Sequence, residues 1–195
     1  MRTLVVYCHP VPESFGAAVR DVVLETLRKK GDEIRLIDLY AEGFDPVLGA
    51  DERRRYNEGA PDDPALREHF AHLGWAEAIL FVYPTWWYGL PAMLKGWLDR
   101  VWVTDVVFRL PADGGTIESL MTHIRKLGVI TTCGASWWLS WLIGQPGRKT
   151  LLRGMWALTG RGCKTLYMAH YNMDSSTDAS RAAYLAKVRK KLARW

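Results

Sequence analysis

The sequence predicts an α/β fold in which helices cover both faces of a five-stranded parallel sheet. Short apolar runs alternate with amphipathic segments, and the runs are continuous, as expected for strands that are buried on both sides. With right-handed crossovers, five such strands fit the doubly wound order 2-1-3-4-5. The chain carries no obvious linker, so we expect a single domain over residues 1–195.

Five segments have the composition of strands in such a sheet. TLVVYC at 3–8 is rich in β-branched residues, and the His-Pro that follows ends the run. The other four are apolar or alternating and are bounded by turn residues. They lie at 33–39, 78–84, 127–134 and 164–171.

Helices are expected in the intervals between these strands. Ser14 is a suitable N-cap for a helix that stops at Gly31, and Pro91 suits the first turn of another helix. A further helix is expected at 65–76, and a capped amphipathic helix at the end of the sequence. Between the fourth and fifth strands we expect a loop and then a long helix from about Pro146.

Charge and composition exclude several classes of protein. The net charge is +5, but the basic residues are spread over helix-like segments, so we expect no nucleic-acid partner. No apolar run could span a bilayer and the N-terminus has no signal-peptide organisation, so we expect a cytoplasmic protein without an integral membrane segment. Cys8, Cys133 and Cys163 form no CxxC motif, and buried free thiols in a reducing compartment are expected.

Common catalytic and metal-binding patterns do not occur in the sequence. His69 and His72 share an expected helix, but no acidic or cysteine ligands match them, so no metal site is expected. No serine stands in a GxSxG context, and Cys133 has no evident base partner.

Three unusual stretches follow three of the expected strands. They are HPVPESFG after 3–8, PTWWYG after 78–84 and TTCGAS after 127–134. In doubly wound sheets, ligands bind beyond the carboxyl ends of the strands that flank the point where the strand order reverses. The predicted order therefore brings all three stretches to the edge where a ligand would bind.

The first stretch has the parts of an anion site. A hydroxyl at Ser14, the free amides of Phe15 and Gly16 in a first helical turn, and a donor at His9 could together hold a phosphate. Neither GxGxxG nor the Walker pattern is present. An ordinary N-cap with a histidine in a turn explains these residues equally well.

The second stretch is unusual because three adjacent aromatic side chains cannot all face one core. A flavin ring needs an apolar wall and main-chain hydrogen bonds to its polar edge. Thr85, Trp86, Trp87 and Tyr88 could supply both, with Gly89 letting the backbone approach. The alternative is an aromatic corner of the core.

The third stretch offers hydroxyl and amide groups at a strand end. Thr131 and Thr132 suit a ribityl chain, and the amides near Cys133 and Gly134 suit the flavin edge where negative charge accumulates on reduction. A pair of threonines at a strand end can also reflect β-propensity alone.

Taken together, these motifs resemble the flavodoxin-like NAD(P)H:quinone oxidoreductases, the family of DT-diaphorase and the smaller bacterial quinone reductases. The combination HPxxxSF, PxxWYGxPAxLKGWxDRV and TT is much more specific than any one part. The resemblance is good over residues 3–135 and holds only in outline over 136–195.

The resemblance implies a bound flavin, with FAD favoured and FMN as the alternative. It also implies that NAD(P)H is the electron donor, that a quinone or related electrophile accepts two electrons by ping-pong hydride transfer, and that the protein is a homodimer. The implied cofactor-binding residues are His9, Ser14, Phe15, Gly16, Pro84, Thr85, Trp86, Trp87, Tyr88, Thr131, Thr132, Cys133 and Gly134. The implied catalytic residues are Trp87, Tyr88, Gly134 and Arg148.

The sequence departs from the family after the threonine pair. Similar proteins have two glycines there, then a Tyr and a His that balance charge on the reduced flavin, whereas this chain reads CGASWWLSWLIGQPGRK. The amides of Gly134 and Ala135, or Arg148, would have to meet that charge. The tryptophans in this stretch suit a dimer interface or a hydrophobic acceptor.

Two other functions fit the same fold. A single-electron carrier flavodoxin is disfavoured, because those proteins usually have an acidic surface. A regulatory accessory flavoprotein is the other alternative, because similar small quinone reductases attach to membrane potassium-efflux systems. The basic C-terminal helix is compatible with such a partner.

Overall fold

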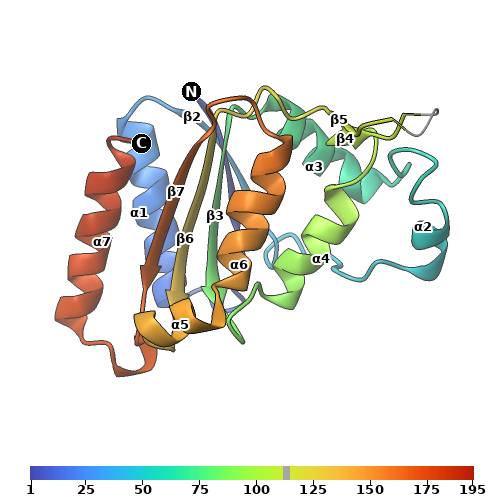
Figure 1. The fold of residues 1–195 in the computed structure, drawn as a ribbon. Helices are drawn as coiled ribbons and strands as arrows, with labels where there is room; N and C mark the ends of the chain where they lie inside the picture. The colour runs from blue at the N-terminus through green and yellow to red at the C-terminus, as the bar shows by residue number, and fades with distance from the viewer. Residues whose placement is uncertain (112–114) are drawn as a thin grey trace.

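The fold contains a five-stranded parallel sheet in the order β2-β1-β3-β6-β7 (Figure 1). The structure is a computed structural model that describes residues 1–111 and 115–195. The strands are β1 (Arg2–Tyr7), β2 (Glu33–Asp38), β3 (Ala78–Thr85), β6 (Lys126–Cys133) and β7 (Lys164–His170). Renumbered along this sheet, the order is the predicted 2-1-3-4-5, which confirms the doubly wound, flavodoxin-like fold class.

Helices cover both faces of the sheet (Figure 1). One layer contains α1 (Phe15–Lys29) and α7 (Asp178–Leu192). The other contains α3 (Pro64–Trp75), α4 (Ala92–Val101) and α6 (Pro146–Lys149), which continues into the π-helical segment η1 (Thr150–Met155) and the 3₁₀ turn η2 (Trp156–Leu158). The short helix α2 (Ala50–Arg54) and the small antiparallel pair β4 (Phe108–Arg109) and β5 (Glu118–Ser119) lie beyond the sheet.

Two hydrophobic cores form, one on each face of the sheet. Along β1, Leu4 and Val6 pack with the α3 and α4 layer, whereas Val5 and Tyr7 pack with the α1 and α7 layer. This division follows from the two-residue period of a strand. Because both faces are covered, the strands read as continuous apolar runs, which is the pattern that the sequence displays.

The structure corrects the expected loop after the fourth strand. Residues Trp137–Ile143 form a helix, α5, whose N-cap Ser136 accepts a hydrogen bond from the Leu139 amide at 3.4 Å. Of this helix only Ser140 is buried. The run WWLSWLI has no alternation between apolar and polar faces, so it carries no helical period. The expected helix start at Pro146 is confirmed.

Arg100 fixes the long connection between β2 and α3 onto α4. Its buried guanidinium donates to Glu52 at 3.0 Å and to Asp63 at 3.2 Å. A third bond goes to the Asp45 carbonyl at 2.7 Å. Arg100 therefore forms internal ion pairs with Glu52 and Asp63. If the connection moved away, the buried guanidinium would lose its partners and its charge would be uncompensated, which is strongly destabilising. The network therefore holds the connection in one place.

Gly96 lets the same connection lie directly on α4. A Cβ at Gly96 would be 2.1 Å from the Pro46 carbonyl oxygen and 2.4 Å from the Pro46 Cβ. No side chain fits there without moving the backbone. The exposed Gly74 on α3 is a suitable contrast, because a Cβ there would meet no atom within 4 Å.

We expect Gly96→Ala to lower the free energy of unfolding by about 3 kcal/mol, at the upper end for an overpacked site, because the clash is with backbone. Gly74→Ala should leave it unchanged or raise it by about 0.5–1 kcal/mol, since alanine is the better helix former. Urea unfolding of both variants measures the difference. Equal stability of the two would contradict the tight contact between Gly96 and Pro46.

Candidate functional site

The three stretches that follow β1, β3 and β6 meet at a cleft of about 660 Å³ at the carboxyl edge of the sheet. Nine predicted residues line it: His9, Pro84, Thr85, Trp86, Trp87, Tyr88, Thr132, Cys133 and Gly134. The lining also includes Ala135, whose amide the sequence analysis named, and Leu139, Met173 and Asp174, which it did not identify. The convergence expected from the strand order is therefore present.

The start of α1 adjoins the cleft through His9, but the predicted residues Ser14, Phe15 and Gly16 are not among those that line it. Ser14 is its N-cap, and its Oγ accepts a hydrogen bond from the Ala17 amide at 3.1 Å. The amides of Phe15 and Gly16 are the first two of the helix, and such amides have no acceptor within their own helix. They carry the partial positive charge of the helix N-terminus, which favours an anion.

His9 lies against this helix start. Its Nδ1 accepts a hydrogen bond from the Val11 amide at 3.0 Å, so in the neutral ring the proton is on Nε2. Burial lowers the pKa of His9, which keeps the ring neutral at pH 7. A Cβ at Gly16 would lie 3.2 Å from His9 Cδ2, so the small residue lets the ring approach the helix.

Two predicted residues have structural roles as well. The Phe15 ring packs edge-on against His170, with ring centroids 5.6 Å apart, so only its main chain faces a ligand at the helix start. Thr131 is buried, and its hydroxyl bonds to the Thr85 hydroxyl at 2.9 Å. Of the two threonines, Thr132 is the one that lines the cleft.

Residues 86–89 form a tight turn with an unusual backbone. The Gly89 amide donates to the Trp86 carbonyl at 2.9 Å, and both central residues are left-handed, with φ of 47° at Trp87 and 62° at Tyr88. Two positive φ angles are typical of a type I′ turn, where Asn and Gly are preferred. A left-handed residue other than glycine costs about 1–2 kcal/mol. The sequence analysis did not predict a positive φ at any residue of this turn.

The turn presents its aromatic side chains to solvent. Trp87 is 96% exposed and Trp86 43% exposed. The alternative of an aromatic core corner is therefore wrong for these two side chains. An exposed indole on a strained turn stabilises nothing within the chain, which is typical of a ligand-contacting position.

The loop after β7 supplies two of the lining residues that the sequence analysis missed, Met173 and Asp174. The Asn172 amide donates to the Ala135 carbonyl at 3.1 Å, which ties this loop to the third stretch. Asp174 follows, and a Cβ at Gly134 would lie only 2.7 Å from its Oδ2. The strand order itself contained the signal, because β7 is next to β6 and its carboxyl end reaches the same edge.

Arg148 lies beside the cleft and is not among the residues that line it. Its guanidinium donates to Gln145 Oε1 at 2.8 Å, and Gln145 Nε2 donates to the Tyr171 hydroxyl at 3.0 Å. Burial raises the pKa of the nearby Tyr83 and Tyr167 phenols, which therefore stay protonated at neutral pH. These residues form a polar chain next to the cleft.

The histidines and cysteines have structural surroundings. Trp97 Nε1 donates to the buried His69 Nδ1 at 3.3 Å. Cys8, Cys133 and Cys163 are buried and free, as predicted, and burial raises the pKa of Cys8 to about 12. Over the described ranges, no group of three or more potential His, Cys, Asp or Glu metal ligands occurs, and no helix is both long enough and apolar enough to cross a membrane.

Comparison with known proteins identifies the family. A protein family described as having a flavodoxin-like fold matches residues 1–192. The chain belongs to this family. The resemblance proposed from the sequence motifs is therefore confirmed.

Relatives within the family carry oxidoreductase names. NAD(P)H dehydrogenase (quinone) 1 of Rattus norvegicus is 32% identical over 155 residues, which cover 69% of this chain and 54% of the relative. An uncharacterized NAD(P)H oxidoreductase of Haemophilus influenzae is 37% identical over 102 residues, which cover 52% and 50%. The chain spans about half the length of these curated relatives.

A solved structure matches the whole fold. The NAD(P)H:quinone oxidoreductase from Methanothermobacter marburgensis superimposes with a TM-score of 0.84 at 26% identity. The match covers 100% of this chain and 96% of that one. The family likeness therefore extends to residues 136–195, where the motifs alone were weak.

The left-handed turn generates a stability prediction. We expect Trp87→Gly to raise the free energy of unfolding by up to about 1 kcal/mol, because glycine adopts positive φ without strain and the lost indole was almost fully exposed. Trp86→Gly should lower it, since that side chain is partly buried and its φ is not left-handed. Chemical denaturation of the protein without added ligand checks both. Equal destabilisation of the two variants would show that the turn is not strained.

Proposed function

We propose that the chain is a flavin-dependent NAD(P)H oxidoreductase that reduces quinones or related electrophiles. The observation that carries this proposal is an exposed aromatic wall that lines a cleft of about 660 Å³ together with His9, whose ring lies against the N-terminus of α1. An apolar wall suits a flat heterocycle, and a helix N-terminus suits a phosphate tail. The names of the relatives and of the matching solved structure support the same activity.

The anionic tail of the flavin would bind at the start of α1. The amides of Phe15 and Gly16, the Ser14 hydroxyl and the Nε2–H of His9 are the donors that would face it. All four groups lie within one loop and one helical turn. FAD is favoured and FMN is the alternative. Release of the cofactor and its identification by mass would distinguish them.

The ring would lie against Trp86, Trp87 and Tyr88 with its polar edge toward the third stretch. A bound flavin would supply two-electron hydride chemistry between NAD(P)H and the acceptor, in the ping-pong order that the family resemblance implies. The chain's part is to position both substrates and to stabilise charge. The amides of Gly134 and Ala135 would serve that role at the ring edge.

Arg148 would act from outside the cleft, through Gln145 and Tyr171. A cation at one end of this hydrogen-bonded chain favours negative charge on the side of the Tyr171 hydroxyl. Asp174 acts in the opposite sense, because its carboxylate at Gly134 disfavours a second negative charge nearby. The balance of the two groups would set how readily charge accumulates at this edge.

We also propose that the protein is a homodimer that buries part of α5. Trp137 and Trp138 are adjacent residues of α5 and are each 60% exposed, and α5 lies at the carboxyl end of the sheet (Figure 1). Exposed tryptophans in pairs are typical of interface anchors. An interface there would lie close to the cleft, next to Leu139, which lines it.

The first test of the function is the visible spectrum of the purified protein and its turnover with NADPH and a benzoquinone. We expect a flavin spectrum, and Trp87→Ala should bind the flavin about three- to tenfold more weakly, because it loses aromatic stacking. Trp87→Phe keeps an aromatic ring and should retain most of the affinity. A colourless protein that takes up neither FAD nor FMN would refute the proposal.

Light scattering tests the dimer. Trp138→Glu is expected to weaken association by about 2 kcal/mol or more, since a charge would replace an interface anchor. The control is Val47→Glu, which places the same charge on an apolar side chain that is 67% exposed elsewhere. A wild-type protein that is monomeric at micromolar concentration would contradict the proposal.

A further inference from the structure

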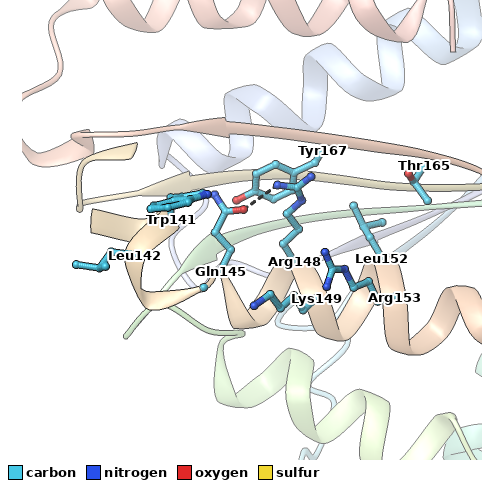
Figure 2. Close-up of a pocket in the computed structure, with 10 residues that line it drawn as sticks. Trp141, Leu142, Gln145, Arg148, Lys149, Leu152, Arg153, Thr165 and Tyr167 are labelled. Atoms are coloured by element: carbon cyan, nitrogen blue, oxygen red, sulfur yellow. Dashed lines mark hydrogen bonds between the residues drawn. The ribbon is translucent and has the colours of Figure 1, made fainter. Parts of the chain in front are cut away.

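A second, larger cavity of about 960 Å³ lies between α5, the α6–η1 helical run and the edge strand β7 (Figure 2). It shares no lining residue with the cleft. Its lining includes Trp141, Arg148, Lys149, Arg153 and Tyr167. Figure 2 shows the three cationic side chains on one helical run, with Trp141 and Tyr167 on the neighbouring elements.

The cavity is strongly positive. None of the residues that line it is acidic, and Arg148, Lys149 and Arg153 form no ion pair within the described part of the chain. The sequence contains no Asp or Glu between Glu118 and Asp174. The cations in that interval are Arg125, Lys126, Arg148, Lys149, Arg153, Arg161 and Lys164.

Contacts within the chain explain the position of Arg148, which bonds to Gln145 and stacks on Tyr167, but no such contact holds Lys149 or Arg153 in the described part of the chain. Lys149 and Arg153 are four residues apart on the same helical run, and like charges at that spacing destabilise a helix by about 0.2–0.5 kcal/mol. The run also includes the π-helical segment η1, and such segments are frequent at functional sites. Cations that are gathered at a cost and left without acidic partners are typical of an anion site.

Aromatic side chains border the same space. The Trp141 indole is 65% exposed, and the Arg148 guanidinium stacks over the Tyr167 ring at 4.7 Å. A planar group could therefore lie against Trp141 while its attached anion meets the cations. Phosphate on a planar base combines these two chemical features.

A small cavity of about 10 Å³ lies between the large cavity and the cleft. Gln145, Arg148 and Tyr167 line it together with the large cavity. Thr85, Tyr88 and Cys133 line it together with the cleft. The two sites therefore share walls, and because the small cavity has room for no more than about one water, a dinucleotide that occupied both sites would cross between them at the surface.

We propose that the cavity between α5, α6–η1 and β7 binds a phosphate-bearing planar ligand, and that this ligand is the nucleotide portion of NAD(P)H. The second part rests on the proposed function. Lys149 and Arg153 would bind the phosphates, and Trp141 would contact the base. The other source of the same chemistry is a separate nucleotide that binds here without donating electrons.

The test compares Lys149→Gln/Arg153→Gln with Lys190→Gln/Lys191→Gln, which removes two exposed cations from α7 on the other face of the sheet. Calorimetric titration with inorganic pyrophosphate and with adenosine 2′,5′-bisphosphate measures binding without turnover. The KM for NADPH is measured with a benzoquinone acceptor. We expect the first variant to weaken binding of both probes and to raise this KM by about tenfold each, since charge-assisted hydrogen bonds to phosphate are lost. The α7 variant should change neither quantity.

The outcomes separate the two parts of the proposal. Weaker probe binding with an unchanged KM for NADPH would support the phosphate site and overturn its assignment to the dinucleotide. Unchanged probe binding and unchanged KM would overturn the proposal altogether. If the wild-type protein is colourless and inactive while probe binding still depends on Lys149 and Arg153, the phosphate site stands and the proposed oxidoreductase function fails. Circular dichroism confirms that both variants are folded.

Discussion

The parallel register between β3 and β6 is the constraint on which the site depends. It pairs Tyr83 with Thr131 and Thr85 with Cys133, and so brings the ends of two strands to the same level. A slip of one residue would move every side chain of a strand to the opposite face. Because both faces of this sheet are buried, such a slip would disrupt two cores at once, and the register is strongly fixed. The cleft inherits its geometry from this pairing.

Pro84 shows how the sheet opens where the cleft begins. Proline has no amide to donate, and β1 pairs with β3 only as far as Tyr7 and Val82. The last bond between them runs from the Cys8 amide to the Val82 carbonyl at 3.0 Å. Beyond that point β3 continues along β6 alone, so the chain after β1 is free to turn toward α1. The gap lies between the first and third strands, where the strand order reverses.

Much of the fold followed from patterns that are local in sequence. Apolar runs marked the strands, Ser14 and Pro91 marked helix starts, and the parallel order then placed three loops at one edge. Helix α5 was missed because its residues are apolar all round. Neither the burial of Arg100 nor the close contact of Gly96 was visible, because both depend on residues 45–63, which meet α4 only after folding.

Site residues could be predicted where an unusual sequence motif marks their loop. They could not be predicted where the fold brings in a residue from a loop of ordinary composition. His9 and Trp87 belong to unusual stretches and could be selected. Asp174 stands in an ordinary polar loop and reaches the cleft only through the position of β7. The larger cavity is lined by residues from a helical run and from a strand that are separate in the sequence. The lack of acidic residues in this part of the sequence indicates an anion site only after folding has placed Lys149 and Arg153 at the same cavity.

The turn at Trp87 and Tyr88 affects ligand binding beyond the contacts it offers. A flexible loop would lose conformational entropy when a ligand ordered it, and that loss would weaken affinity. Here the hydrogen bond from Gly89 to Trp86 fixes the backbone before any ligand arrives. The entropy of ordering this turn is therefore lost during folding and not during binding, so the aromatic side chains of the turn are preorganised for a ligand. Substitutions that relax the turn should raise thermal stability and lower ligand affinity.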